Sequence, residues 1–204
     1  VQVAPHCLVR AGGKGLLVDV RKHFRDVEVL DRGNRVRVQP GATVRSVNAR
    51  LALYGKKLGP DPASEGAATM GGVIANNSAG MACGTEFNTY QTLESMTFVL
   101  PSGTVINTAD ADANQQFKAQ EPELFDTLVK LQKRVRENPE SVAKIERHFA
   151  LKNTMGYGVN AFLDFEDPVK VFEHLLIGSE GTLAFIAEAV LRTVPVPKVK
   201  TTSV

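Results

Sequence analysis

Residues 58–84 form a stretch of mostly small and amide side chains, LGPDPASEGAATMGGVIANNSAGMACG. Gly and Ala allow a backbone to approach a large ligand closely, because Gly lacks a Cβ and Ala carries only a small one. Consecutive N–H groups in turns form concave anion sites, and Thr69, Asn76, Asn77 and Ser78 add neutral donors. The stretch favours a diphosphate or a planar ring system lying along the main chain. A flexible surface loop with a Gly-Gly turn is the alternative.

The pair Gly71-Gly72 precedes VIANNSAG and is expected to open a short helix whose N–H groups face an anion. The stretch is not a phosphate-binding kinase loop, since the Gly-Lys-Ser/Thr ending is absent. Its spacing also differs from the dinucleotide fingerprint G-x-G-x-x-G. The predicted groove is open and lined by Ala67, Gly71, Gly72, Asn76 and Glu180.

A second stretch, residues 177–195, begins with the turn Gly178-Ser179-Glu180-Gly181. This turn is expected between a helix and a strand, where it places a carboxylate and open N–H groups at a strand edge. Glu180 is then placed to accept hydrogen bonds from ribose hydroxyls or to contact an adenine. The alternative is a helix C-cap turn with a solvated Glu180.

Composition excludes several classes of protein. The net charge of +2 implies no polyanionic partner, and the absence of Trp argues against a stacking platform for nucleic acid. No apolar run approaches the ~20 residues of a membrane span, and two cysteines make neither a disulfide framework nor a metal site. With 43% hydrophobic residues, we expect a soluble intracellular domain with its own core.

Hydrophobic patterns predict the elements that position these stretches. Strands are expected at residues 15–20, 27–30, 35–40 and 182–195, with a hairpin over 93–108 that turns at Leu100-Pro101-Ser102-Gly103. Helices are expected at 44–54, capped by Thr43, and at 122–138, 139–148 and 167–178. This order lacks regular βαβα alternation, so we predict an α+β fold with a mixed or antiparallel sheet flanked by helices.

Four motifs occur in order: GPDPAS, TMGGVIANNSAGMACGT, KNTMGYGVNAFLDF and LLIGSEGTLAFIAEAVLRTVP. Together they resemble the FAD-binding domain of the vanillyl-alcohol oxidase superfamily, over about residues 15–197. Within it, the chain is most similar to FAD-linked D-2-hydroxyacid dehydrogenases of the D-lactate dehydrogenase and glycolate oxidase flavin-subunit type, including forms fused to an iron–sulfur domain.

The resemblance implies a non-covalent FAD held between two α+β subdomains. The segment from residue 60 to 80 would wrap the pyrophosphate and flavin edge, and the turn and strand after it at 180–186 would meet the adenosine part. The implied cofactor-binding residues are Pro62, Ser64, Ala67, Ala68, Met70, Gly71, Gly72, Asn76, Asn77, Gly80, Glu180, Gly181 and Ile186.

Two departures from the family pattern concern the ends of the chain. The N-terminal VQVAPHCLVRAGGKG does not match the family's pyrophosphate loop, and the family's cap domain would follow residue 196. We therefore expect a fragment: residues 1–38 a remnant of an incomplete first FAD subdomain, 39–197 the second, and 198–204 a tail or linker. Alone, this chain is expected to fold but to be inactive and largely free of FAD.

Other reactive residues have a plain interpretation beside the functional one. Cys83 lies where a superfamily member could attach flavin, but we interpret it as a small apolar residue. His148 and His174 are interpreted as surface or core histidines rather than bases. Residues 152–154, beside Gly156-Tyr157, either lie near the flavin or form a polar turn. We therefore assign no catalytic and no metal-binding residue in this chain.

Two functions stay open. The first is the FAD domain of a cytoplasmic enzyme, or one peripheral to the inner face of a membrane, that oxidises D-lactate, glycolate or D-2-hydroxyglutarate. Its implied partners are a 2-hydroxyacid bound through the cap domain and an iron–sulfur domain or other electron acceptor, with no nucleic acid. The second is a non-catalytic nucleotide-binding or interaction module that keeps only the scaffold.

Overall fold

A computed structural model describes residues 19–197 of the chain. Six strands form one sheet in the order β1-β2-β6-β4-β5, with β3 pairing with β6 beside this path, and every pairing is antiparallel. The strands are β1 (Val27–Leu30), β2 (Arg35–Val38), β3 (Lys56–Leu58), β4 (Leu93–Val99), β5 (Val105–Asn107) and β6 (Phe185–Pro195). The predicted α+β class with an antiparallel sheet is confirmed.

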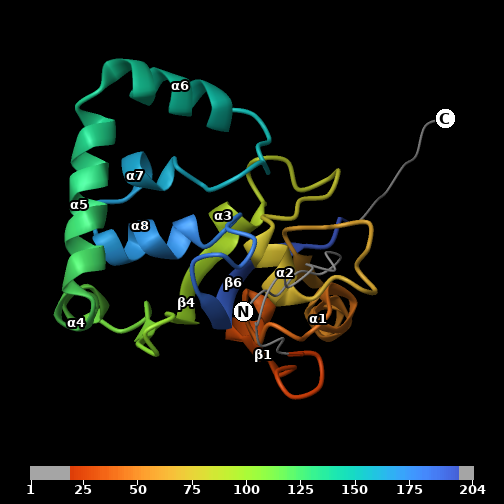
Figure 1. Ribbon diagram of the computed structural model, residues 1–204. Helices are drawn as coiled ribbons and strands as arrows, with labels where there is room; N and C mark the ends of the chain where they lie inside the picture. The colour runs from red at the N-terminus through yellow and green to blue at the C-terminus, as the bar shows by residue number, and fades with distance from the viewer. Residues whose placement is uncertain (1–18, 198–204) are drawn as a thin grey trace.

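Eight α-helices lie within the described residues: α1 (Val44–Leu51), α2 (Met70–Ala75), α3 (Thr89–Thr92), α4 (Ala113–Gln120), α5 (Pro122–Arg136), α6 (Pro139–Phe149), α7 (Ala161–Asp164) and α8 (Pro168–Leu175). Short 3-10 helices occupy Asp31–Gly33 and Ala52–Tyr54. In the view of Figure 1, α5, α7 and α8 stack on one side of the strands, and α1 and α2 lie on the other. None of the helices in residues 19–197 is long and apolar enough to cross a lipid bilayer.

Strand β6 organises the sheet because its length lets it pair with three other strands. Val36 and Val38 of β2 face the core with 0% and 1% exposure, while Arg35 and Arg37, which alternate with them, are half-exposed on the other face. Val36 lies opposite Leu191, and Val38 opposite Ala189. This period of two is what a sheet with one wet face requires.

Local signals fix most helix ends as the sequence predicts, although α8, expected to run to residue 178, ends at Leu175. The Thr43 side chain accepts a hydrogen bond from Ser46 N and caps α1, while Gly55 closes the following 3-10 turn in the left-handed region. Helices α5, α6 and α8 each begin with Pro in the first turn. The 93–108 hairpin forms, and Gly103 N donates to Leu100 O across its turn at 2.9 Å.

An aromatic cluster joins α8 to the sheet. Phe172 of α8 lies 5.2 Å from Phe98 of β4 and 5.6 Å from Phe117 of α4, measured between ring centroids. All three rings are at least 97% buried. The cluster fixes α8 against the strands, and with α8 the turn that follows it.

Several predicted bounds need correction. The strand expected at 15–20 lies largely outside the described residues, and Asp19 and Val20 are not in a strand. Strand β2 ends at Val38 because Gln39 and Pro40 turn away toward α1. Strand β3 and helices α3, α4 and α7 were not expected from the sequence. The division into subdomains at residue 38 stays a prediction.

Candidate functional site

Helix α2 is the short helix expected at Gly71-Gly72, but it is an interior element. All six of its residues are buried. Met70 N donates to Ala42 O at 2.8 Å, and Gly71 N donates to Pro40 O at 2.9 Å. The prediction that these N–H groups face an anion, in an open groove lined by Gly71 and Gly72, is therefore wrong for this structure. The chain itself satisfies the donors, since the start of α2 pairs with the approach to α1.

The C-terminal end of α2 meets the turn that follows α8. Gly178 N donates to Ile74 O at 3.2 Å, and Glu180 N donates to Ala75 O at 2.7 Å. Two stretches about a hundred residues apart in sequence, each chosen for its chemistry, are thus joined by backbone hydrogen bonds. Glu180 adopts a left-handed conformation with φ 54°, which is uncommon for a residue with a side chain and common at functional sites.

Gly178 shows how closely the backbones approach. Its φ is 85°, and a Cβ at this position would lie 2.7 Å from Gly156 O and 3.8 Å from Asn77 Cβ. A side chain would therefore be strained by its backbone conformation and would also collide with a neighbouring carbonyl. The glycine is needed here for both reasons.

A third segment, which follows α6, closes the group. Lys152 Nζ donates to Gly80 O at 3.0 Å, and Asn77 Nδ2 donates to Asn153 O at 3.5 Å. Tyr157 Oη and Thr182 Oγ1 share a hydrogen bond of 2.7 Å. We call residues 76–84, 152–157 and 178–182 together the three-loop cluster. In Figure 1 the chain leaving α6 approaches the loop that follows α2.

Asp61 shapes the first loop of the cluster. Its two carboxylate oxygens accept from Cys83 N and Ala82 N, each at 3.2 Å. Gly80 packs so closely that a Cβ there would lie 1.9 Å from Asp61 O. Cys83 is 3% exposed, and burial raises the pKa of its thiol, so the interpretation of Cys83 as an unreactive apolar residue agrees with its surroundings.

The polar groups of the cluster leave some capacity unused. Lys152 is the only Lys or Arg in the three loops. Asn77 Oδ1 is buried and accepts no hydrogen bond from the described residues. At the other end of the small-residue stretch, the Arg45 guanidinium lies 3.2 Å from the Cβ position of Gly66 and 3.6 Å from a Glu65 oxygen. Lys152 and Arg45 thus lie beside the small-residue stretch 58–84, which contains no Lys or Arg of its own.

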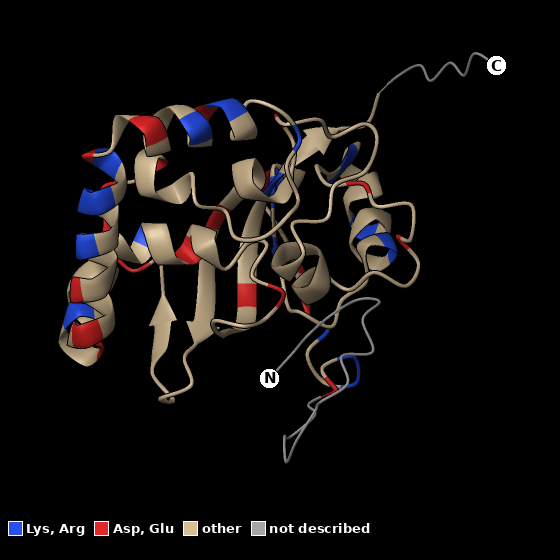
Figure 2. Cartoon of the chain, turned by 45° about the horizontal axis from the view of Figure 1, so that its top comes forward, with Lys and Arg blue, Asp and Glu red and all other residues tan. Residues whose placement is uncertain are grey.

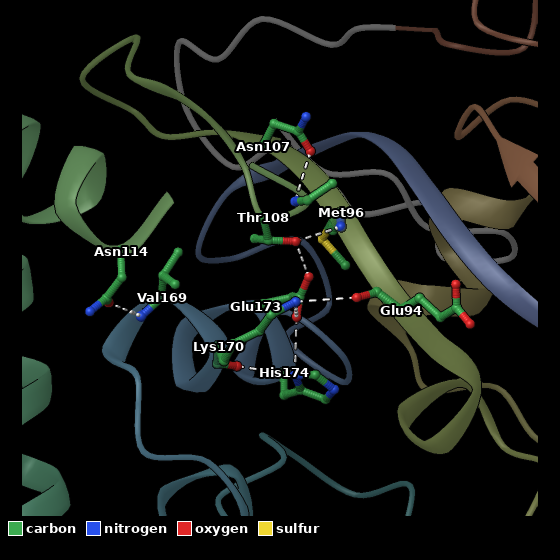
Figure 3. A network of polar contacts seen from close by, with 10 residues as sticks. Glu94, Met96, Asn107, Thr108, Asn114, Val169, Lys170, Glu173 and His174 are labelled. Carbon is green, nitrogen blue, oxygen red and sulfur yellow. Dashed lines mark hydrogen bonds and ion pairs between the residues drawn. The ribbon is translucent and has the colours of Figure 1, made fainter. Parts of the chain in front are cut away.

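A buried polar network holds α8, which carries the Gly178 turn (Figure 3). Glu173 is 0% exposed; it accepts from Thr108 Oγ1, and from Lys170 Nζ at 3.0 Å. Lys170 Nζ also donates to Glu94 O at 3.2 Å, and Thr108 Oγ1 accepts from Met96 N at 2.8 Å. The network ties α8 to β4 and to the end of β5.

The titratable groups in this network are shifted by burial. Burial raises the pKa of Glu173, against the opposing effect of Lys170. Burial also lowers the pKa of His174 to about 4. The His174 ring stacks on Phe165 at 4.0 Å and is 4% exposed. His174 is therefore the satisfied core histidine that the sequence suggested, while His148 is exposed on α6.

The structure places the predicted cofactor residues in three environments, and their role stays a prediction. Ala68, Met70, Gly71, Gly72 and Ile186 are buried; Pro62, Ser64, Asn76, Asn77, Gly80, Glu180 and Gly181 are half-buried; Ala67 is exposed. Asn76, Asn77, Gly80, Glu180 and Gly181 come together in the three-loop cluster.

Sequence reasoning missed Asp61 and Arg45 as parts of this region. Asp61 is part of the GPDPAS motif, where an acid between two prolines suggests a turn carboxylate. Nothing local singles out Arg45, because it comes near Gly66 through the pairing of Arg45 N with Glu65 O at 3.0 Å. Within residues 19–197, no group of three or more His, Cys, Asp or Glu side chains could hold a metal ion.

A comparison with known protein families shows which family this chain belongs to. Residues 4–109, just over half of the chain, match the family described as FAD binding domain. The chain belongs to the FAD binding domain family. The match begins before residue 15, where the resemblance was expected to start. Family membership implies FAD as the cofactor.

Curated relatives extend the similarity along the chain. A D-2-hydroxyglutarate dehydrogenase of Pantoea ananatis is 29% identical over 195 residues, covering 92% of this chain and 18% of that protein. The mitochondrial D-lactate dehydrogenase [cytochrome] 1 of Saccharomyces cerevisiae is 26% identical over 200 residues, covering 98% of this chain and 25% of that protein. The chain thus spans a quarter or less of the length of these relatives.

Among solved structures, alkyldihydroxyacetonephosphate synthase is similar with 19% identity and a TM-score of 0.49, covering 86% of this chain and 22% of that chain. The glucooligosaccharide oxidase of Acremonium strictum gives 17% identity and a TM-score of 0.49, covering 86% of this chain and 24% of that chain. The α+β assignment rests on the sheet described above and on the family match.

The three-loop cluster fits a flavin nucleotide in its donor set. FAD has carbonyl, hydroxyl, amide and phosphate groups, so it needs donors, acceptors and a cation. The cluster offers the unused Asn77 Oδ1 as an acceptor and the Lys152 ammonium as a cation, while the N–H groups of Gly178, Glu180 and Gly181 are bonded within the chain and hold the turn in place. The small residues of the first loop keep this backbone accessible.

Proposed function

We propose that this chain is the FAD-binding domain of a flavin-dependent oxidoreductase that oxidises a D-2-hydroxyacid such as D-lactate, glycolate or D-2-hydroxyglutarate. The observation that carries the proposal is the pairing of Gly178 N and Glu180 N with the last carbonyls of α2. This pairing brings the two predicted cofactor stretches side by side. The relatives named D-2-hydroxyglutarate dehydrogenase and D-lactate dehydrogenase support the class of substrate.

In this proposal the described residues bind and orient the cofactor. Bound FAD would supply the acceptor for the α-hydrogen of the hydroxyacid. The Gly178 turn and the 76–84 loop hold their backbones at fixed separation. The carboxylate of Asp61 keeps the 76–84 loop closed. A positioned cofactor lowers the entropic cost of bringing the reacting atoms together.

The proton of the substrate hydroxyl is assigned to a base outside the described residues. His174 is buried and paired with Lys170 O at 3.0 Å, and its depressed pKa keeps it neutral at pH 7. His148 lies exposed near the end of α6, outside the three loops, and no hydrogen bond of the described residues joins its ring to the cluster. A cap domain that binds the acid, an iron–sulfur domain or other electron acceptor, and a cytoplasmic location are further parts of the proposal.

The test is FAD titration followed by a substrate panel in the full natural chain. We expect saturable 1:1 FAD binding, measured by flavin fluorescence, and reduction of a dye acceptor with one of the three D-2-hydroxyacids but not with its L-enantiomer where one exists. FAD binding without turnover of any of them would favour the alternative, a non-catalytic nucleotide-binding module. Absence of FAD binding would contradict the proposal at its first step.

A further inference from the structure

We propose that Lys152 is the residue whose positive charge faces an anionic group of the bound cofactor. This inference deepens the proposed function and rests on it. The anionic group is either a phosphate of FAD or the reduced flavin ring, and the experiment below separates these two sources of one chemistry.

The position of Lys152 carries the first step. Its Nζ donates to Gly80 O at 3.0 Å and so bridges the second loop of the cluster to the first. The neighbouring Asn153 O accepts from Asn77 Nδ2 at 3.5 Å. Lys152 is therefore held over the first loop, while the residue itself is exposed. Its ammonium has three donors, of which this contact uses one.

The charges around Lys152 carry the second step. No carboxylate oxygen of the described residues lies within the 4.0 Å of Lys152 Nζ that an ion pair requires. Asp61, whose carboxylate holds the first loop, directs its two oxygens to the N–H groups of Ala82 and Cys83. Arg45, by contrast, has Glu65 at 3.6 Å. Lys152 is thus the cation of this region that has no paired carboxylate.

The third step concerns how a ligand anion would replace the Gly80 carbonyl as the partner of Lys152. A hydrogen bond from an ammonium to an anionic oxygen is roughly twice as strong as one between neutral groups. A ligand anion would therefore compete well with the neutral Gly80 carbonyl for Lys152. Charge-assisted bonds of this kind correspond to a change of about tenfold to a hundredfold in affinity.

The experiment compares three variants of the full natural chain after removal of flavin. Lys152→Met removes the charge and keeps much of the aliphatic stem, while Lys152→Arg keeps the charge. Lys144→Met is the matched control, because Lys144 is an exposed lysine on α6, a helix that carries both signs of charge (Figure 2). Dissociation constants for FAD and riboflavin are measured by fluorescence at low and high salt, and midpoint potentials by dye equilibration.

If the anion is a phosphate, we expect Lys152→Met to weaken FAD at least tenfold and to reduce its salt dependence; in either case Lys152→Arg should stay within a fewfold of the parent and Lys144→Met unchanged. If the anion is a phosphate, riboflavin binding stays unchanged. If the anion is the reduced ring, binding of oxidised FAD stays near the parent value and the midpoint potential of Lys152→Met falls instead.

Three results would overturn the inference. The first is a Lys152→Met variant with the parent's FAD affinity, salt dependence and midpoint potential. The second is an equal loss of FAD and riboflavin affinity, which would give Lys152 a structural role only. The third result is a parent chain that binds no FAD, which contradicts the proposed function as well; the first two results leave that function intact.

Circular dichroism melting checks that each variant folds. If Lys152→Met unfolds, Lys152→Gln takes its place.

Discussion

Helix α8 contributes to two polar regions that differ in kind. The network around Glu173 is buried, and its carboxylate, ammonium and hydroxyl groups are bonded to one another. The three-loop cluster that follows α8 is half-exposed, and it contains Asn77 Oδ1 without a donor and Lys152 without a carboxylate. A satisfied buried network specifies a position. The cluster, with capacity to spare, is suited to accept a ligand.

The largest expected effect comes from disrupting the buried network around Glu173. Glu173→Ala would leave the Lys170 ammonium and the Thr108 hydroxyl without their buried partner, and we expect a loss of roughly 3–5 kcal/mol in the free energy of unfolding. Urea denaturation followed by circular dichroism measures it. Glu166→Ala is the control, because Glu166 pairs with Arg136 at the surface, where an ion pair contributes about 1 kcal/mol or less. Equal losses for the two variants would contradict the distinction.

The next effect is a pH dependence of stability from His174. Its folded pKa of about 4 lies below the ordinary 6.5, so the unfolded chain binds more protons between these values. Stability is then fully present above pH 6.5 and is lost as the pH falls toward 4, by roughly 3 kcal/mol at one pKa unit per 1.4 kcal/mol.

His174→Phe isolates this effect from the other groups around it. Glu173, with its raised pKa, acts in the opposite sense as the pH falls. The stability difference between parent and His174→Phe should therefore shrink or reverse as the pH falls from 6.5 to 4. Parallel pH curves for the two chains, measured by urea denaturation, would show that His174 does not titrate this way.

A smaller effect tests the cluster through its backbone. Gly178→Ala should cost roughly 1–3 kcal/mol and weaken FAD binding, because its φ is 85° and its Cβ would lie 2.7 Å from Gly156 O. Gly103→Ala is the matched control, with φ 91° and no atom within 4 Å of its Cβ. We expect Gly103→Ala to lose stability from backbone strain but to keep its FAD affinity. If Gly178→Ala keeps its FAD affinity as well, the turn is not part of the binding surface.

The smallest effect concerns one side-chain contact within the cluster. Tyr157→Phe removes the 2.7 Å hydrogen bond to Thr182 Oγ1, which corresponds to about 0.5–1.5 kcal/mol and so to at most about a tenfold weaker FAD binding in calorimetric titration. Tyr54→Phe, at an exposed tyrosine of the 3-10 helix that follows α1, should bind FAD as the parent does. A difference between them of more than a hundredfold would mean that Tyr157 contacts the ligand itself.

The two regions also differ in how far the sequence predicts them. Local signals such as the Thr43 cap and the Pro101-Ser102-Gly103 turn act over a few residues, so they were found with nearly the right bounds. Strand β3, Lys-Lys-Leu, has little β character of its own and exists because it pairs with residues 193–195 of β6. Such a strand is invisible until its partner is placed.

The candidate site followed the same division. The small-residue stretch and the 178–181 turn could be selected by residue type alone, and the structure joins them. Composition could not show that the start of α2 is satisfied by Pro40 O and Ala42 O. It could not show either that Lys152 reaches Gly80 across 72 residues. Both facts depend on which distant carbonyls the fold brings near.

Hydrogen exchange of the full natural chain with and without FAD, read by mass spectrometry, tests the central claim most directly. The three-loop cluster should gain protection on FAD binding at residues 76–84, 152–157 and 178–182. Helices α5 and α6 should exchange as before, since neither contributes to the cluster. Saturating FAD that protects α5 or α6, and leaves the three loops unchanged, would contradict this account of where the cofactor binds.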